Sequence, residues 1–351
     1  MTSTFLDNKT WRYFWHPVCT MQELEASDTG RGILLQTKLL GTELVIAKLE
    51  SVVIAMNNRC PHRSAKLHLG WNCGDAIQCP YHGWKYGADG ICVEIPALPN
   101  EPIPPNAKTT TYDCEVKYEL VWVRLDGSAG TEIPRHDAYN DLEFKCVLGQ
   151  SYNWKTHSAR RVENYTDLAH FPFIHPKTLG SEGHTTFLAP DIDFRREGRM
   201  RFSYKPSKGS RSGVNSQGEL TALKFSDYTI NLPFGVNVDL TLQDGSRTVL
   251  WIWATPVDDT YCRSFWFVCR NRDQDGPDQP HIDQQMRILE EDIDVVESQD
   301  PEQIPHPRDE IAVTSDKVSL TYRRILYELC KAKSEGPEAI KAYMTTERHN
   351  I

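Results

Sequence analysis

The sequence of 351 residues has no hydrophobic run long enough to cross a membrane, and its first fifteen residues contain no apolar signal segment. It also has no block of lysine and arginine, and its formal net charge is -9 at pH 7. Nucleic-acid binding normally needs a basic face, so this charge disfavours it. We therefore expect a cytoplasmic protein that binds neither a membrane nor nucleic acid.

Further absences limit the possible functions. The chain has no glycine-rich dinucleotide fingerprint, so it is not expected to take electrons from NAD(P)H by itself. It has no internal repeat and no low-complexity segment, and its 39% hydrophobic and 25% charged residues are ordinary for a globular protein. Its length leaves room for two domains with cores of their own.

Two of the ten cysteines belong to a metal-type pattern, Cys60-Pro61-His62 followed after 16 residues by Cys79-Pro80-Tyr81-His82. The other cysteines show no second spacing of this kind, and in a reducing compartment we expect most of them to be buried thiols. They are Cys19, Cys73, Cys92, Cys114, Cys146, Cys262, Cys269 and Cys330.

Each half of this pattern supplies one thiolate and one imidazole from a loop rich in glycine or proline. In a Rieske [2Fe-2S] centre two cysteines hold one iron and two histidines hold the other. Zinc is the alternative, because most Cys2His2 sets bind zinc. A zinc finger, however, pairs Cys with Cys and His with His, whereas this order alternates. The pattern therefore predicts a [2Fe-2S] cluster held by Cys60, His62, Cys79 and His82.

The distribution of strand and helix patterns predicts an α+β chain in two parts. Short β-branched runs up to residue 125 indicate an all-β domain over residues 1–128, and turn residues follow it. We expect a linker over 129–150 and a second domain over 151–351. The second domain combines helices near 158–168, 280–297 and 316–332 with strand-like runs between 187 and 270. The alternating segment 231–240 predicts one half-buried antiparallel strand.

A second metal pattern lies in the first helix of the later domain, with Asn164, Asp167, His170 and His175. In a regular helix, histidines five residues apart point about 140 degrees from each other, so they would not share a metal. Pro172 lies between them, lacks an N–H, and is expected to distort or end the helix so that they converge. Asp167 is one turn before His170 and can accept a hydrogen bond from an imidazole.

Two histidines and one carboxylate on one face of the metal are typical of non-haem Fe(II) oxygenases. The helix near 280–297 carries several acidic residues, which can be ranked by their angle from its apolar face. Asp292 and Glu290 can point inward, whereas Glu291 and Asp294 are expected to be solvated. The wheel alone does not choose between Asp292 and Glu290.

The two cluster segments, Cys60 to Leu67 and Cys79 to Trp84, closely resemble those of ring-hydroxylating and demethylating Rieske non-haem iron oxygenases. Segments 14–18 and 316–324 extend the resemblance over nearly the whole chain. The nearest branch includes vanillate, dicamba and methylxanthine demethylases. The resemblance implies that the Asp of the Glu291-Asp292 pair binds iron, so Glu290, Glu291 and Asp294 are expected to be solvated. It also implies that a helix-grip catalytic domain follows an N-terminal Rieske domain.

The resemblance also implies how electrons reach the iron. Three subunits meet head to tail, as a homotrimer or as a heterotrimer with a related subunit. Asp167 bridges a cluster histidine of one subunit to His170 of its neighbour. Electrons come from NAD(P)H through a separate reductase or ferredoxin.

The function implied is that of a terminal oxygenase which uses O2 to hydroxylate a small, (hetero)aromatic substrate. Oxidative N- or O-demethylation with release of formaldehyde is favoured. Hydroxylation of an aromatic or alicyclic C–H bond is the alternative, and an electron carrier without oxygenase activity is an alternative of another class. The residues expected to line the substrate pocket are Phe171, Phe173, Leu179, Phe187, Phe234 and Trp253.

Overall fold

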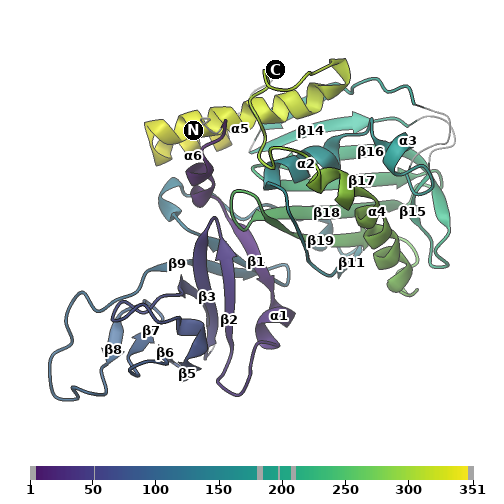
Figure 1. Ribbon diagram of the computed structural model, residues 1–351. Coiled ribbons are helices and arrows are strands. Elements are labelled where there is room, and N and C mark those ends of the chain that lie inside the picture. Colours follow the sequence, from purple (N-terminus) through teal and green to yellow (C-terminus); the bar gives the residue numbers. More distant parts are fainter. Residues whose placement is uncertain (1–4, 51, 180–184, 197, 207–210, 347–351) are drawn as a thin grey trace. The chain divides into compact units, whose positions relative to one another are not determined.

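The computed structural model divides the chain into two compact units (Figure 1). One is residues Trp11–Ile133, and the other joins Met1–Thr10 to Pro134–Ile351. The structure describes residues 5–50, 52–179, 185–196, 198–206 and 211–346. The expected linker over 129–150 differs from this division, because β11 (Lys145–Leu148) pairs with β19 (Cys262–Arg270) and so belongs to the sheet of the larger unit.

The smaller unit contains two antiparallel sheets, as its β-branched runs predict. The larger sheet has the order β1-β10-β9-β4-β3-β2 and the smaller one the order β5-β6-β7-β8. The strands of the first are β1 (His16–Thr20), β2 (Leu34–Leu39), β3 (Thr42–Leu49), β4 (Val52–Asn57), β9 (Thr111–Lys117) and β10 (Leu120–Arg124). Those of the second are β5 (Trp71–Asn72), β6 (Ala76–Gln78), β7 (Lys85–Gly87) and β8 (Cys92–Glu94).

The larger unit is built on a nine-stranded antiparallel sheet with the path β11-β19-β18-β17-β16-β14-β13. Two further strands lie off this path, β12 (Tyr152–Trp154) on β19 and β15 (Arg211–Val214) on β16. The remaining strands are β13 (Ile192–Arg196), β14 (Arg199–Tyr204), β16 (Leu220–Asn231), β17 (Gly235–Leu242) and β18 (Arg247–Pro256).

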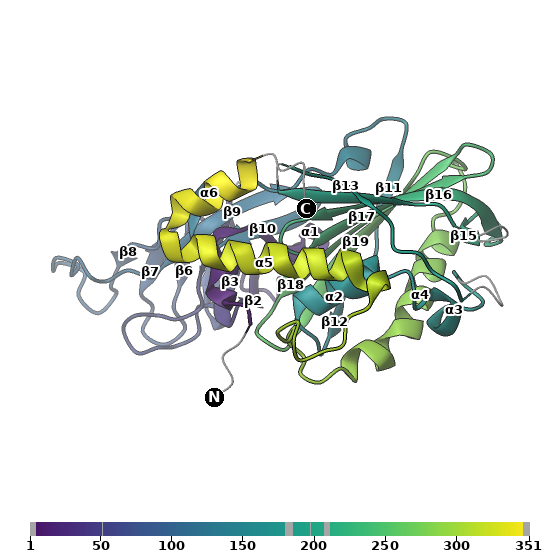
Figure 2. The ribbon, with the colours of Figure 1, turned by 90° about the horizontal axis from the view of Figure 1, so that it is seen from above.

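Helices pack against this sheet and confirm the α+β class. They are α2 (Ser158–Thr166), α3 (Phe171–Ile174), α4 (Gln279–Glu297), α5 (Lys317–Glu335) and α6 (Pro337–Thr345), and the smaller unit adds α1 (Met21–Glu25). Helix α2 contacts β17, β18, α4 and α5, whereas α6 packs on α5 (Figure 2). No helix among the described residues is long and apolar enough to cross a membrane.

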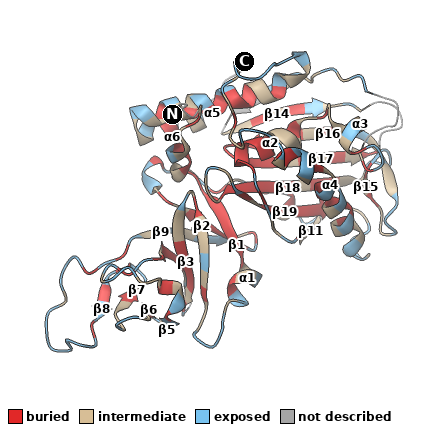
Figure 3. Ribbon diagram, viewed as in Figure 1, coloured by how far each residue is buried: buried red, intermediate tan, exposed pale blue. Residues whose placement is uncertain are grey.

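The central strands of the larger sheet are buried on both faces (Figure 3). Side chains alternate along a strand, so Leu250 and Ile252 of β18 face one side and Trp251 and Trp253 face the other. The side chain of Trp251 stacks on the buried ring of His136, at 5.1 Å between centroids. The opposite face, with Leu250 and Ile252, is therefore the one left to line a site beneath the helices.

Two local predictions were wrong. Residues 231–240 do not form one strand, because β16 ends at Asn231 and β17 begins at Gly235. The cysteines outside the cluster pattern are not mostly buried thiols. Cys146 and Cys269 lie opposite each other on β11 and β19 and form a disulfide, Cys73 is exposed, and Cys114 and Cys330 are half-buried.

Candidate metal centres

The four residues of the cysteine and histidine pattern lie on two loops of the same design. In each loop a cysteine amide donates to a carbonyl that follows it, Cys60 to Ala65 and Cys79 to Trp84, both at 2.8 Å. Each cysteine carbonyl in turn accepts an amide hydrogen bond from within its loop, from Ser64 or from Gly83. Both cysteines are buried. The two loops therefore present their sulfur atoms in equivalent positions.

The histidines of these loops lie side by side. The centroids of the His62 and His82 rings are 4.6 Å apart, and the Trp84 ring stacks on His62 at 4.5 Å. Nδ1 of His62 is buried, and it has no hydrogen-bond partner among the described residues. A buried polar nitrogen without a partner is unfavourable unless a ligand binds it. Two thiols, two adjacent imidazoles and this unpaired nitrogen fit a [2Fe-2S] cluster.

The sulfur atoms already receive hydrogen bonds. The hydrogen bond between the two thiols lowers the pKa of Cys60 and raises that of Cys79, and burial opposes the shift at Cys60. The hydroxyl of Tyr86, with its oxygen 3.1 Å from the Cys60 sulfur, and the backbone amides of His62 and Arg63 lower the pKa further. Donors aimed at a sulfur stabilise its charged form, which is the form that binds iron.

The second metal pattern lies at the junction of α2 and α3. Helix α2 ends at Thr166, where the Asp167 backbone becomes extended, and α3 begins at Phe171. The break therefore precedes His170, and Pro172 does not cause it, contrary to our expectation. Pro172 instead lies in the first turn of α3, where the missing N–H has no helical partner to lose.

The break brings His170 and His175 together with Asp292 of α4. Nε2 of His175 is 3.1 Å from Oδ1 of Asp292, and Nε2 of His170 is 3.6 Å from the same oxygen. One ligand atom from each of the three residues lies within 4.8 Å of the others. Two imidazoles and one carboxylate at this spacing fit the facial set of a non-haem Fe(II) site.

The carboxyl of Asp292 is held ready to bind a cation. Although burial opposes ionisation, the hydrogen bond from His175 and the positive charge of Arg161 lower its pKa. The amide Nδ2 of Asn164 donates to Oδ1 of Asp292 at 3.2 Å. The predicted Asn164 and Asp292 thus lie in direct contact.

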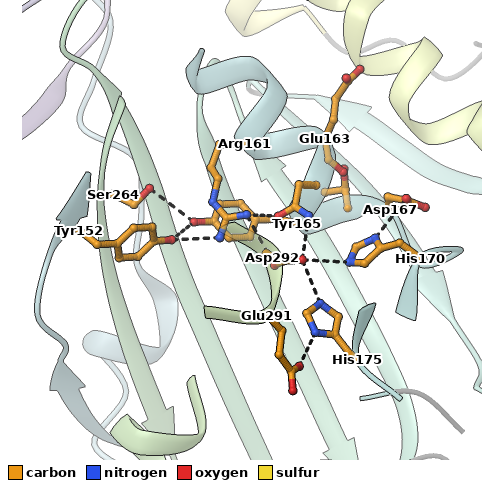
Figure 4. Close-up of polar contacts among 12 residues, drawn as sticks. Tyr152, Arg161, Glu163, Tyr165, Asp167, His170, His175, Ser264, Glu291 and Asp292 are labelled. Atoms are coloured by element: carbon orange, nitrogen blue, oxygen red, sulfur yellow. Dashed lines mark hydrogen bonds and ion pairs between the residues drawn. The ribbon is translucent and has the colours of Figure 1, made fainter. Parts of the chain in front are cut away.

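Each histidine is oriented by a carboxylate on the ring nitrogen that faces away from Asp292. Nδ1 of His170 is 3.1 Å from Oδ2 of Asp167, and Nδ1 of His175 is 2.7 Å from Oε2 of Glu291 (Figure 4). These contacts direct a proton to Nδ1 of each ring, so that Nε2, which faces Asp292, is the nitrogen that can bind a metal. Thr178 donates to the same Glu291 oxygen.

Our expectation that Glu291 is solvated was wrong. The helical wheel ranked each acidic residue by its angle from the apolar face of the helix, which packs on the sheet. Glu291 points away from that face. The α3 segment packs beside α4, however, and places His175 against it. The sequence offered one signal for this role, because Glu291 is a carboxylate directly before the chosen ligand, Asp292. Glu290 and Asp294 are exposed, in agreement with the wheel for Asp294.

A mostly apolar cavity opens beside the three ligands. One wall is the sheet face that carries Val238, Leu240, Leu250 and Ile252, and the other comes from α4 and the α3 segment. Ligand sites in proteins are likewise lined mainly by apolar groups with a few polar ones. The lining of this cavity therefore suits a small apolar ring system next to the metal ligands.

Only part of the predicted pocket lines this cavity. Phe171 and Leu179 do. The others do not: Phe173 is 68% exposed, Trp253 points to the opposite face of β18, Phe234 precedes β17 and packs on His157, and Phe187 packs on Tyr204. The sequence shows that these side chains are aromatic, but the face that each one occupies depends on strand register.

Two polar residues of α4 at the cavity were missed by the sequence analysis. Nε2 of His281 and Nε2 of Gln284 are buried and have no hydrogen-bond partner among the described residues, and both residues line the cavity. Burial lowers the pKa of His281 to about 4, which keeps its ring neutral. Such unpaired groups in an apolar wall fit a ligand that carries hydrogen-bonding atoms.

Models of known protein families match the two segments that contain these candidate centres. The Rieske [2Fe-2S] domain model matches residues 14–113, and the model of the Vanillate O-demethylase oxygenase C-terminal domain matches residues 154–332. Methylxanthine N3-demethylase NdmB of Pseudomonas putida is 40% identical over 352 residues, which cover 97% of this chain and 96% of the relative. Methylxanthine N1-demethylase NdmA of the same species is 40% identical over 333 residues, or 94% of this chain and 92% of NdmA.

Solved structures give the same result for the fold. The structure of Pseudomonas putida CBB5 NdmA with caffeine has a TM-score of 0.90 at 39% identity and covers 98% of both chains. Dicamba monooxygenase bound to dicamba has a TM-score of 0.75 at 20% identity, with 92% of this chain and 98% of that chain covered. At that identity the likeness shows a shared fold alone.

Proposed function

This chain belongs to the Rieske non-haem iron oxygenases, and on that premise we propose that it oxidatively demethylates a small N-methylated heteroaromatic compound. The chain is the terminal oxygenase component of such a system. The observation that carries the proposal is the convergence of His170, His175 and Asp292 at the mouth of an apolar cavity.

We assign the metal-binding roles to the residues of the two centres. Cys60, His62, Cys79 and His82 hold the [2Fe-2S] cluster, and His170, His175 and Asp292 hold Fe(II). When bound, the cluster supplies single electrons and the iron binds O2 beside the substrate. The protein residues around the iron site orient the ligands, through Asp167 and Glu291, and exclude bulk water, through the apolar strand wall.

The substrate class follows from the cavity. Gln284 offers an amide N–H and His281 a neutral ring nitrogen, each without a partner among the described residues, in a wall that is otherwise mostly apolar. A flat ring with carbonyl oxygens or ring nitrogens would satisfy both groups while its methyl group faces the metal ligands. Methylxanthines, the substrates in the names of NdmA and NdmB, are of this chemical class.

The overall reaction balances with electrons from a partner. One N–CH3 group, O2, two electrons and two protons give N–H, formaldehyde and water. The first product is an N-hydroxymethyl compound, which loses formaldehyde without further oxidation. The electrons come from NAD(P)H through a separate reductase, and we place the reaction in the cytoplasm.

We further propose a trimer in which Asp167 carries the link between subunits. Oδ2 of Asp167 contacts His170, and its side chain remains 42% exposed, so another chain can reach it. Asp167→Ala is expected to slow electron transfer to the iron by at least tenfold when the variant is saturated with Fe(II). Stopped-flow reoxidation of the reduced cluster measures this rate. Unchanged coupled turnover in this variant would reject the bridge.

Two measurements test the function. Iron analysis distinguishes an oxygenase, with three irons per chain, from an electron carrier, with two. Formaldehyde release is then measured on a panel of N-methyl and O-methyl compounds with a surrogate reductase. Formaldehyde from N-methyl purines or pyrimidines supports the proposal, whereas an oxygenated product without formaldehyde indicates C–H hydroxylation.

A further inference from the structure

Arg161 is a fully buried cation in the wall of the iron site. It lies on α2, three residues before Asn164, and its side chain has 0% exposure. Its guanidinium carbon is 3.6 Å from the centroid of the Trp154 ring and 3.9 Å from that of the Tyr165 ring. Buried arginines are rare unless their charge is compensated, so this position calls for a reason.

The polar contacts of Arg161 point toward the iron site. Nη2 donates to the hydroxyl of Tyr152 at 3.3 Å (Figure 4). Nη1 donates to Oδ1 of Asn164. Nη1 also lies 3.8 Å from Oδ2 of Asp292. Two aromatic rings thus hold the guanidinium in place, and its hydrogen-bonding edge faces a metal ligand and the side chain that supports that ligand.

The contact with Asn164 determines which way its amide points. Because Oδ1 of Asn164 accepts from Arg161, Nδ2 is the group that faces Asp292, and it donates to Oδ1 of that carboxylate. If the amide were flipped, its oxygen would face the carboxylate oxygen and repel it. Arg161 therefore selects the amide orientation that stabilises Asp292.

The two oxygens of Asp292 have different surroundings. Oδ1 faces His170, His175 and Asn164, whereas Oδ2 faces the guanidinium of Arg161. The cation attracts Oδ2 away from the histidines, so that Oδ1 is the oxygen presented to the metal. A carboxylate that binds through one oxygen leaves more positions on the iron for O2 and substrate.

We propose that Arg161 is a positioning residue that sets the amide orientation of Asn164 and the direction of the Asp292 carboxylate. It touches neither substrate nor metal and acts through these two side chains. This inference rests on the proposed iron-binding role of Asp292. Removing supporting contacts of this kind typically lowers metal affinity 10- to 100-fold.

The test is an Fe(II) titration of Arg161→Met after selective removal of the mononuclear iron. We expect about a 10- to 100-fold weaker affinity, with the absorbance of the cluster unchanged as an internal control. Arg161→Lys keeps the positive charge but lacks the planar guanidinium with its several N–H donors. We expect this variant to keep only part of the Fe(II) affinity that Arg161→Met loses. Arg160→Met is the matched control: Arg160 is also a buried arginine of α2, but its contacts are with Pro301, Gln303 and Glu310.

A double-mutant cycle separates positioning from general destabilisation. If Arg161 acts through Asn164, the loss of affinity in Arg161→Met combined with Asn164→Ala is clearly smaller than the product of the two single losses. Trp154→Leu, which removes one ring from the guanidinium, gives the same test without a change of charge if Arg161→Met does not fold. We expect Trp154→Leu to lower the Fe(II) affinity less than Arg161→Lys does.

Two outcomes overturn the proposal. The first is a folded Arg161→Met variant whose Fe(II) affinity stays within twofold of that of the unmodified protein. The second is an unchanged Fe(II) affinity in both Trp154→Leu and Arg161→Lys. Either result shows that Arg161 does not position the ligand. Asp292→Ala is titrated in parallel. If that variant also binds Fe(II) as tightly as the unmodified protein, the assigned iron site is wrong, which is a different failure from that of Arg161.

Discussion

The two metal centres of this chain are assembled in opposite ways. The cluster residues come from two neighbouring loops, between Cys60 and His82, and each loop holds its cysteine by hydrogen bonds within itself. The iron residues come from an irregular segment after α2 and from the distant helix α4. His175 and Asp292 are each held by a side chain that is far away in sequence, whereas Asp167 holds His170 from within the same segment. The first centre is local in sequence, and the second depends on packing of the whole unit.

This difference predicts that the two centres can be lost separately. Cys79→Ala removes one of the two thiolates, and we expect the cluster to be lost completely while the mononuclear iron remains. Asp292→Ala is expected to do the reverse, because one carboxylate is a third of the protein ligand set. The iron content should fall from three per chain to about one in Cys79→Ala and to about two in Asp292→Ala.

Absorption and electron paramagnetic resonance spectra assign the remaining iron in each variant. Glu290→Ala is the control for Asp292→Ala, because Glu290 is an exposed residue of the same helix. Loss of both centres in either variant would contradict the separation, since it would mean that one centre depends on the other for folding.

The same contrast explains what could be predicted from the sequence. The α+β class, the family and the [2Fe-2S] cofactor were predicted correctly, because short spacings and strand patterns are local properties. The position of Asp292 followed from a resemblance and not from the helical wheel, which left Glu290 as an alternative. His170 and His175 were identified as a pair, but the reason for their convergence was wrong, because the helix ends before His170.

Features that depend on long-range packing were missed. The face of β18 occupied by Trp253 depends on register, and the contact of Glu291 with His175 depends on where α3 meets α4. Arg161 has the sequence appearance of a surface cation on a helix, yet it is fully buried between aromatic rings. No local pattern distinguishes such an arginine from a solvated one.

A buried ion-pair network should stabilise the larger unit, which contains the packing-dependent centre, and leave the smaller unit unaffected. Arg323 of α5 makes two contacts with the carboxylate of Glu163 on α2, at 2.5 and 2.8 Å, and a third with Glu310 at 2.8 Å. Arg323→Met leaves Glu163 as an unpaired buried charge, which is expected to destabilise the larger unit by about 3 kcal/mol. Chemical denaturation followed by the signals of each unit measures this loss.

The pH dependence of that loss has a definite sign. Burial raises the pKa of Glu163, and removal of the guanidinium raises it further, so the folded variant binds a proton more readily than the unfolded chain. The variant therefore regains stability as the pH falls through the raised pKa of Glu163, and the loss is largest above that pKa. Arg324→Met is the control, because Arg324 is 67% exposed and its pair with Glu328 contributes little. A loss as large in Arg324→Met as in Arg323→Met would contradict the assignment.

Glu291→Gln should weaken the iron site without removing a ligand. The amide keeps the shape of the side chain, but the hydrogen bond to Nδ1 of His175 loses its charge, so the imidazole becomes a weaker base. We expect about a tenfold loss of Fe(II) affinity, measured by titration with the cluster intact. Glu290→Gln on the exposed side of α4 should change nothing, and an equal effect of the two variants would argue against a role of Glu291.

The smallest expected effect is on the local centre, where one hydroxyl can be removed without disturbing the loops. Tyr86→Phe deletes the hydrogen bond to the Cys60 sulfur. This hydrogen bond stabilises the reduced cluster, because the reduced cluster is more negative than the oxidised one. A hydrogen bond contributes about 0.5–1.5 kcal/mol, so the reduction potential is expected to fall by about 20–60 mV. Redox titration of the cluster measures the change, and a rise in potential would contradict it. Because Tyr86 lies in the smaller unit, Fe(II) affinity at the other centre should stay constant, in contrast to Glu291→Gln.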